Sequence, residues 1–220
     1  MDILLAREYI KKAQNQFSEW RGKVSLGNKY YNNDGDIKIT GAAAIDAVNG
    51  YLSAIGQNPL RSADNRISTN WHEILTVQKN AYALTYPPVF TIGRDEDLSE
   101  EVNAALGDEY ARIMSRLGTY ATNAGTAWLE YWVDSDGVFR MAALEADQCA
   151  AFYNPMDIGR EKIALVRAYN LQDADGNDVI HYEVWDKQEV VFVNGDTMEE
   201  EAVVMGGKEV TRMPNHLGEI

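Results

Sequence analysis

Residues 106–144 read LGDEYARIMSRLGTYATNAGTAWLEYWVDSDGVFRMAAL, and the spacing of their apolar residues changes half-way. In the first half the apolar residues recur every three or four positions, as on one face of an α-helix: Leu106, Tyr110, Ile113, Leu117 and Tyr120. After Gly125 apolar and polar residues alternate, which is typical of a strand. The change predicts a helix that ends at Gly125 and an antiparallel hairpin that follows it.

The same alternation continues toward the C-terminus. Strands are predicted over residues 126–133 and 138–144 on either side of the turn Asp134–Gly137, and over 163–169 and 179–185 around a second turn. Residues 189–193 predict one more strand. Consecutive hairpins of this kind indicate an antiparallel sheet.

Helical spacing dominates the region before residue 106. A first amphipathic helix is predicted to end near Gly22, with a stripe of Leu5, Tyr9, Ala13, Phe17 and Trp20. A second is predicted over residues 69–85, with Trp71, Ile74, Leu75 and Tyr82 on one face, and Pro87 and Pro88 end it. We expect a short strand at residues 89–92, and Asp97 with Glu100 as the capping pair of the helix that runs to Gly125. Over residues 22–65 the sequence predicts a long irregular excursion, that is, a segment with little regular secondary structure.

Helices that precede an antiparallel sheet, without βαβ alternation, indicate the α+β class. Residues 1–125 form the mainly helical part of this prediction and residues 126–220 the antiparallel part. We expect one continuous domain.

The composition argues against a protein that grips DNA. The chain has 34 acidic and 20 basic residues and a net charge of −14, whereas affinity for phosphates comes from lysine and arginine. The N-terminus has no basic leader, and the apolar stretch 39–48 is short and contains Asp46, so neither a signal peptide nor a membrane span is expected. Cys149 is the only cysteine, which excludes an intramolecular disulfide.

Motifs of catalysis fail on inspection. His72-Glu73 has Thr76 where a zinc protease needs its second histidine, and Gly207-Lys208 is followed by Glu209 instead of a hydroxyl. Asp173, Asp175 and Asn177 resemble the start of a calcium loop that lacks its glycine and its final glutamate. Cys149 has no nucleophile context and is expected to be a small buried residue. We therefore predict no enzyme and no catalytic, metal or cofactor-binding residue.

Six local patterns then follow one another along the chain. They are Tyr30-Tyr31 before Asp36-Ile37, Asn65-Arg66-Ile67 before Asn70 with Tyr82 ahead of Pro87, Gly125–Trp128 with Tyr131 and the turn 134–137, Val166–Tyr169, Tyr182–Trp185, and His216–Ile220. Their order resembles that of the portal proteins of long-tailed double-stranded DNA phages and prophages. Thr85 departs from the family, in which a glycine is common at that place, and residues 41–49 have no counterpart that we can assign.

The resemblance implies a structural subunit of the phage head. The matched portion is similar to the wing of a portal subunit, while the stem, clip and crown of the family follow the pattern at Leu217-Gly218 and are absent from this chain. Either the chain is truncated at its C-terminus or these residues are only a portion of the protein. The family forms a closed head-to-tail ring, usually of twelve subunits, at the capsid vertex of the virion. Its partners are further copies of itself, terminase, scaffold and capsid protein, and a head-completion or adaptor protein, with assembly in the bacterial cytoplasm.

The resemblance also selects Tyr30, Tyr31 and Arg66 as candidate contacts between subunits. It assigns no residue that contacts DNA. DNA would pass through such a ring without tight binding, which agrees with the acidic composition.

Two other functions remain open from the sequence. A metal-dependent phage nuclease would use acidic clusters such as Asp95-Glu96-Asp97 and Glu199-Glu200-Glu201, although contiguous carboxylates usually lie in solvent. Another head-completion or adaptor protein of the virion is the third possibility.

The charge balance predicts that residues 1–220 do not retain duplex DNA at near-physiological salt. Too few cations are present to displace the counterions of the phosphates. Electrophoretic mobility shift over a range of salt concentrations measures this. Sub-micromolar binding with a steep salt dependence would contradict it and indicate a concealed basic face.

Overall fold

The computed structural model describes residues 1–34, 68–134, 136–172, 176–205, 208–215 and 218. Within them, helices precede strands along the chain. The helices are α1 (Ile3–Tyr31), α3 (Trp71–Leu84), α4 (Glu96–Ala105) and α5 (Tyr110–Ala124). The strands are β1 (Trp128–Val133), β2 (Phe139–Leu144), β3 (Cys149–Tyr153), β4 (Lys162–Gln172), β5 (Asp178–Trp185), β6 (Glu189–Asn194), β7 (Val203–Met205), β8 (Lys208–Val210) and β9 (Arg212–Pro214).

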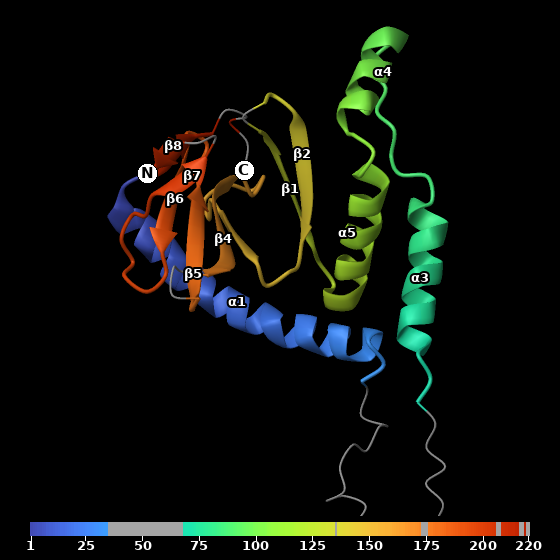
Figure 1. The fold of residues 1–220 in the computed structure, drawn as a ribbon, viewed down its shortest axis with the longest axis horizontal. Coiled ribbons are helices and arrows are strands. Elements are labelled where there is room, and N and C mark those ends of the chain that lie inside the picture. Colours follow the sequence, from blue (N-terminus) through green and yellow to red (C-terminus); the bar gives the residue numbers. More distant parts are fainter. Residues whose placement is uncertain (35–67, 135, 173–175, 206–207, 216–217, 219–220) are drawn as a thin grey trace, which may run out of the picture.

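All strand pairs are antiparallel, which confirms the predicted α+β class, but they form separate sheets (Figure 1). The main sheet has five strands in the order β3-β4-β5-β6-β9. The hairpin β1-β2 is a second sheet that lies over one face of the main sheet, and β7-β8 is a small third hairpin. The predicted strands at 126–133, 138–144, 163–169, 179–185 and 189–193 are confirmed, whereas β3 and the three-residue strands were not predicted.

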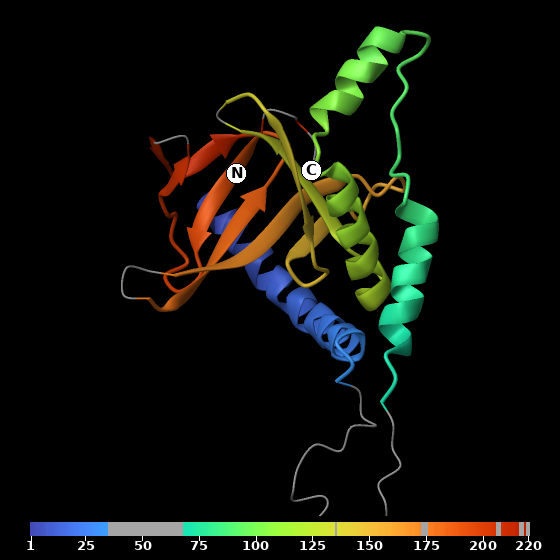
Figure 2. The ribbon, with the colours of Figure 1, turned by 45° about the vertical axis from the view of Figure 1, so that its right-hand side comes forward.

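Helix α1 covers the opposite face of the main sheet and forms the core with it (Figure 2). Its buried stripe consists of Ala6, Ile10, Ala13 and Phe17. These residues pack against alternate positions of the strands: Ala150, Val166, Tyr182, Val184, Val191 and Val193. The predicted stripe was displaced by one position at its start, because Leu5 is exposed and the small Ala6 faces the sheet instead.

Gly22 does not end α1, which was the prediction, since the helix continues to Tyr31. Its last turns stay helical because Val24 and Gly27 are buried and this end of the helix crosses α5. The predicted irregular excursion is therefore wrong for residues 22–31. Its part from 35 to 65 lies outside the described residues.

The helix predicted to run from Asp97 to Gly125 is two helices. The chain breaks between them at Gly107, whose φ of +75° no other residue adopts without strain. Asp95, not Asp97, caps α4, and its side chain accepts a hydrogen bond from the backbone N–H of Leu98. Gly125 ends α5 with a φ of +86°, as predicted. Helix α5 packs on β2, α1 and α3, so that it contacts the hairpin while α1 covers the main sheet.

Helix α3 is confirmed, but the face predicted to be buried is exposed. Trp71, Leu75 and Tyr82 lie in solvent, while Thr76 and Asn80 are buried toward α5. Asn80 Nδ2 donates a hydrogen bond to Thr119 Oγ1 over 2.9 Å. The strand predicted at 89–92 is also wrong, because the backbone of Phe90 bonds to the side chain of Asn103 instead of another strand.

We predict opposite effects from two glycine-to-alanine changes in α1. A Cβ at Gly27 would lie 2.3 Å from the backbone oxygen of Asn123, so Gly27→Ala should destabilise the protein by about 1–3 kcal/mol through overpacking. Gly22 has open space around it, and Gly22→Ala in the same helix should stabilise by about 0.5–1 kcal/mol. Urea denaturation measures both. Equal effects would contradict the close crossing of α1 and α5.

Candidate functional site

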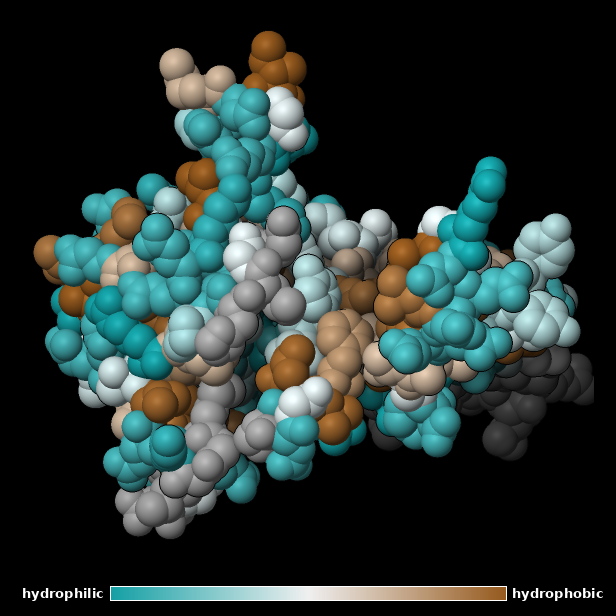
Figure 3. All heavy atoms as spheres, turned by 90° about the horizontal axis from the view of Figure 1, so that it is seen from above, coloured by the Kyte–Doolittle hydropathy of each residue, from teal (hydrophilic) through white to brown (hydrophobic). Residues whose placement is uncertain are grey.

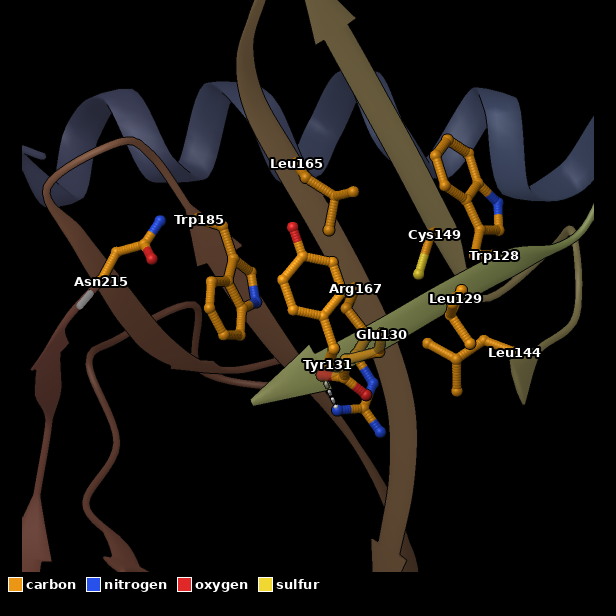
Figure 4. A pocket seen from close by; sticks show the side chains of 10 residues that line it. All are labelled: Trp128, Leu129, Glu130, Tyr131, Leu144, Cys149, Leu165, Arg167, Trp185 and Asn215. Carbon is orange, nitrogen blue, oxygen red and sulfur yellow. Dashed lines mark hydrogen bonds and ion pairs between the residues drawn. The ribbon is translucent and has the colours of Figure 1, made fainter. Parts of the chain in front are cut away.

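A small cavity lies between the hairpin β1-β2 and the main sheet (Figure 4). Alternation along the strands determines what faces it, because Val166 and Val184 point to α1 while Arg167 and Glu183 point to the other side. Arg167 lies directly opposite Glu183 on β5 and Cys149 on β3. The hairpin contributes Glu130 from β1.

Arg167 joins the two layers by ion pairs. Its Nη1 donates to Glu130 Oε1 over 2.7 Å and lies 3.4 Å from Glu183 Oε2, which also accepts from Trp185 Nε1 over 3.2 Å. All three charged side chains are mostly buried, with exposed fractions of 15% for Glu130, 24% for Arg167 and 8% for Glu183. Figure 4 shows Glu130 and Arg167 facing each other across the gap between the layers.

This cluster contains two carboxylates for one guanidinium. Burial raises the pKa of Glu130 to about 7; the charge of Arg167 opposes this shift and that of Glu183 adds to it. The pKa of Arg167 is raised as well, because its two carboxylates outweigh its own burial. A carboxylate with such a pKa could accept a proton, but the cavity holds only about 90 Å³, whereas ligand pockets generally have roughly 300–1,000 Å³. The geometry is that of a structural ion-pair cluster that joins the hairpin β1-β2 to the main sheet.

Cys149 is buried in the same region, as the sequence predicted, with an exposed fraction of 3%. Burial and the nearby carboxylates raise the pKa of its thiol to about 12, while Arg167 opposes this shift. A thiol with this pKa carries almost no thiolate at neutral pH. Nothing in the described surroundings activates it as a nucleophile.

The two acidic runs do not converge on a metal site. Each of the three glutamates has a different partner: Glu199 pairs with Arg7 and Glu200 with Arg212, while Glu201 Oε2 lies 2.5 Å from His181 Nδ1. Asp95 caps α4, and the searched residues contain no cluster of three metal ligands. The calcium-like turn is outside this statement, because residues 173–175 are not described.

His72, from the rejected zinc motif, belongs to a polar junction of three helices. Its Nε2 lies 3.0 Å from Asn123 Oδ1, and Asn123 in turn donates to Asn28 on α1. Asn28 donates to Glu145 over 2.9 Å, so that the junction also reaches the chain after β2.

The candidate interface residues divide between a surface and an internal contact. Tyr30 is 41% exposed at the end of α1, whereas Tyr31 is half-buried, with its ring perpendicular to that of His72 and the two ring centroids 6.5 Å apart. Arg66 lies outside the described residues. Their role between subunits stays a prediction.

Sequence reasoning missed Glu130, Arg167 and Glu183. The sequence signal for such a buried charge is a charged residue two positions from an apolar one, so that both lie on the same strand face. Leu165 with Arg167 and Glu183 with Trp185 are spaced in this way. Such a pattern indicates a buried charge only when the second layer above the sheet is known.

Comparison with known proteins gives the same family in each case. Residues 10–220 match the family described as "Phage portal protein, SPP1 Gp6-like". The portal protein of Clostridium phage phiCD119 is 34% identical over 165 residues, which cover 71% of this chain and 35% of that protein. The portal protein of Bacillus phage SPP1 is 26% identical over 147 residues, which cover 64% of this chain and 28% of that protein. The chain thus spans about a third of the length of these relatives.

Among the described residues no helix is long and apolar enough to cross a bilayer.

We predict that Glu130→Gln makes the protein more stable than the parent above pH 7. The unfolded carboxyl loses its proton near pH 4.5 and the folded one near 7, so the parent binds more protons when folded and loses stability as the pH rises between these values. The loss is about 3 kcal/mol, and glutamine does not suffer it. Urea denaturation at pH 4.5 and pH 8 measures the difference.

The matched control is Glu101→Gln on the exposed face of α4, which should change the stability alike at both values of pH. A difference between Glu130→Gln and the parent that does not grow with pH would contradict the proposed proton on Glu130.

Proposed function

Since this chain belongs to the SPP1 Gp6-like family of phage portal proteins, we propose that it forms the wing of a portal subunit. Such subunits build the structural ring at the capsid vertex through which DNA enters and leaves. The observation that carries the proposal is the family match over residues 10–220, with two relatives named as portal proteins. The function is structural and the chain acts without catalysis.

The physical properties of the chain agree with this role. A net charge of −14 lowers the affinity for a polyanion, and a conduit must let DNA slide. The cavity beside the buried thiol holds only about 90 Å³, which is too small for a substrate. The two-layer packing held by Arg167 suits a rigid structural element.

The partners follow from the proposal. Further copies of the same subunit form a closed ring of about twelve, whose head-to-tail contacts close by rotation. Terminase binds the ring during packaging, scaffold and capsid protein surround it, and a head-completion or adaptor protein joins it to the tail. The ring resides in the virion after assembly in the bacterial cytoplasm.

We predict that the full-length protein forms closed rings, whereas residues 1–220 alone are monomeric or weakly associated. A stable specific contact generally needs more than about 1,000 Å², and a portal subunit would sum this area over several layers. Light scattering coupled to size exclusion, with electron micrographs of the same fractions, measures both. A full-length protein that stays monomeric at high concentration would overturn the proposal.

A further inference from the structure

One segment of the described chain exposes far more apolar surface than the rest. We define the arm as residues 71–105, which comprise α3, the following linker and α4. Tyr82 is 96% exposed, Tyr86 89% and Val89 74%. The other large exposed apolar side chains of the arm are Trp71, Ile74, Leu75, Val77, Phe90, Ile92 and Leu98. Single exposed apolar residues are ordinary, whereas a contiguous set of this kind marks an interaction surface.

The orientation of α3 makes the same point. The helix turns Thr76 and Asn80 toward α5 and its apolar residues toward solvent, which is the reverse of an ordinary surface helix. The subunit's own core gives no reason for this choice. A second molecule that covers the apolar side would give one.

The arm has a defined shape although α4 buries no residue. Asn103 holds the backbone of Phe90 by two hydrogen bonds of 2.9 and 2.7 Å, and Ser99 Oγ accepts from the N–H of Ile92. Tyr110 donates to the carbonyl of Pro88 over 3.0 Å. A surface that is ordered before binding loses less entropy when its partner arrives.

Charge indicates which partner fits. Helix α4 carries Glu96, Asp97, Glu100 and Glu101 and no basic residue. Helix α1 has the opposite balance in a chain of net charge −14, with six basic residues against two acidic ones. The exposed side of its N-terminal half combines apolar and mainly basic side chains around one carboxylate, Glu8, and we call its apolar and basic residues the outer patch: Leu4, Leu5, Lys11 and Lys12. An acidic and apolar arm complements this patch of the same chain.

The N-terminal half of α1, with the outer patch, lies at the far left of Figure 1, whereas α3 and α4 lie at the right and α3 meets α1 only near Tyr31 at its C-terminal end. In Figure 3, apolar brown and hydrophilic teal spheres stand side by side toward the right, where the arm lies. The arm therefore cannot reach the outer patch of its own chain. Pairing between different patches of successive chains is the heterologous contact that closes a ring.

We propose that the arm of one subunit docks on the outer patch of α1 of the next subunit. The proposal rests on the ring-forming function proposed above and assigns one of its contacts to named residues. The apolar residues of α3 and the linker supply buried area, and the four carboxylates of α4 align with Lys11 and Lys12 to set the register.

A photo-crosslink in full-length rings tests the contact directly. Tyr86 is replaced by p-benzoylphenylalanine, which preserves an aromatic ring, and the adducts formed under ultraviolet light are mapped by mass spectrometry. We expect covalent dimers that link the arm to α1 peptides of another subunit. The matched control places the same group at Ile158, which is fully exposed between β3 and β4, and should give no α1 adduct. Adducts to any other part of the full-length chain would overturn the docking.

A charge exchange tests the same contact by function. Glu100→Lys with Glu101→Lys should reduce the ring fraction about tenfold, and the further changes Lys11→Glu and Lys12→Glu should restore it. Asp178→Lys with Asp196→Lys makes the same change in net charge at two exposed positions, the start of β5 and the turn after β6, and should leave rings intact. If the first exchange leaves the ring fraction unchanged, or if the second exchange does not restore it, the docking is refuted while the portal function stands. A parent protein without rings refutes the portal function itself.

Discussion

Ala6, Ile10, Ala13 and Phe17 pack on the five-stranded sheet, and the other layers of the protein are arranged around this contact. It joins the first residues of the chain to strands more than a hundred residues later, so helical and sheet parts cannot form separate cores. The C-terminal end of α1 packs against α5, and α5 packs against α3 and the β1-β2 hairpin. Arg212 completes the closure, because it bonds to the carbonyl of Met1 over 2.8 Å and to Glu200.

The opposite face of the sheet is held by a different kind of interaction. Packing of apolar side chains is tolerant of small shifts, whereas the ion pairs of Arg167 fix one relative position of hairpin and sheet. A buried guanidinium between two carboxylates contributes little net stability, because desolvation offsets the attraction. Its effect is to select one arrangement of the hairpin on the sheet.

The sequence predicted those features that depend on local periodicity. The alternation after Gly125 located five strands and the turn at Asp134–Gly137, and the glycine at 125 located the end of a helix. It failed where a tertiary contact overrides the local pattern: Gly22 is kept helical by the later contacts of Val24 and Gly27, and the inward face of α3 is polar because its neighbour offers Thr119. The buried cluster of Arg167 was out of reach for the same reason, since nothing local shows that a hairpin covers this face.

The position of Cys149 has a practical consequence for labelling residues 1–220. It is the only cysteine of the chain, and the sheet and the hairpin shield its sulfur from solvent. A cysteine introduced at any exposed position would thus be the single thiol of the chain that reacts quickly with a maleimide dye or a spin label. Such a label on residues 1–220 could be followed by fluorescence or paramagnetic resonance without first removing the native residue.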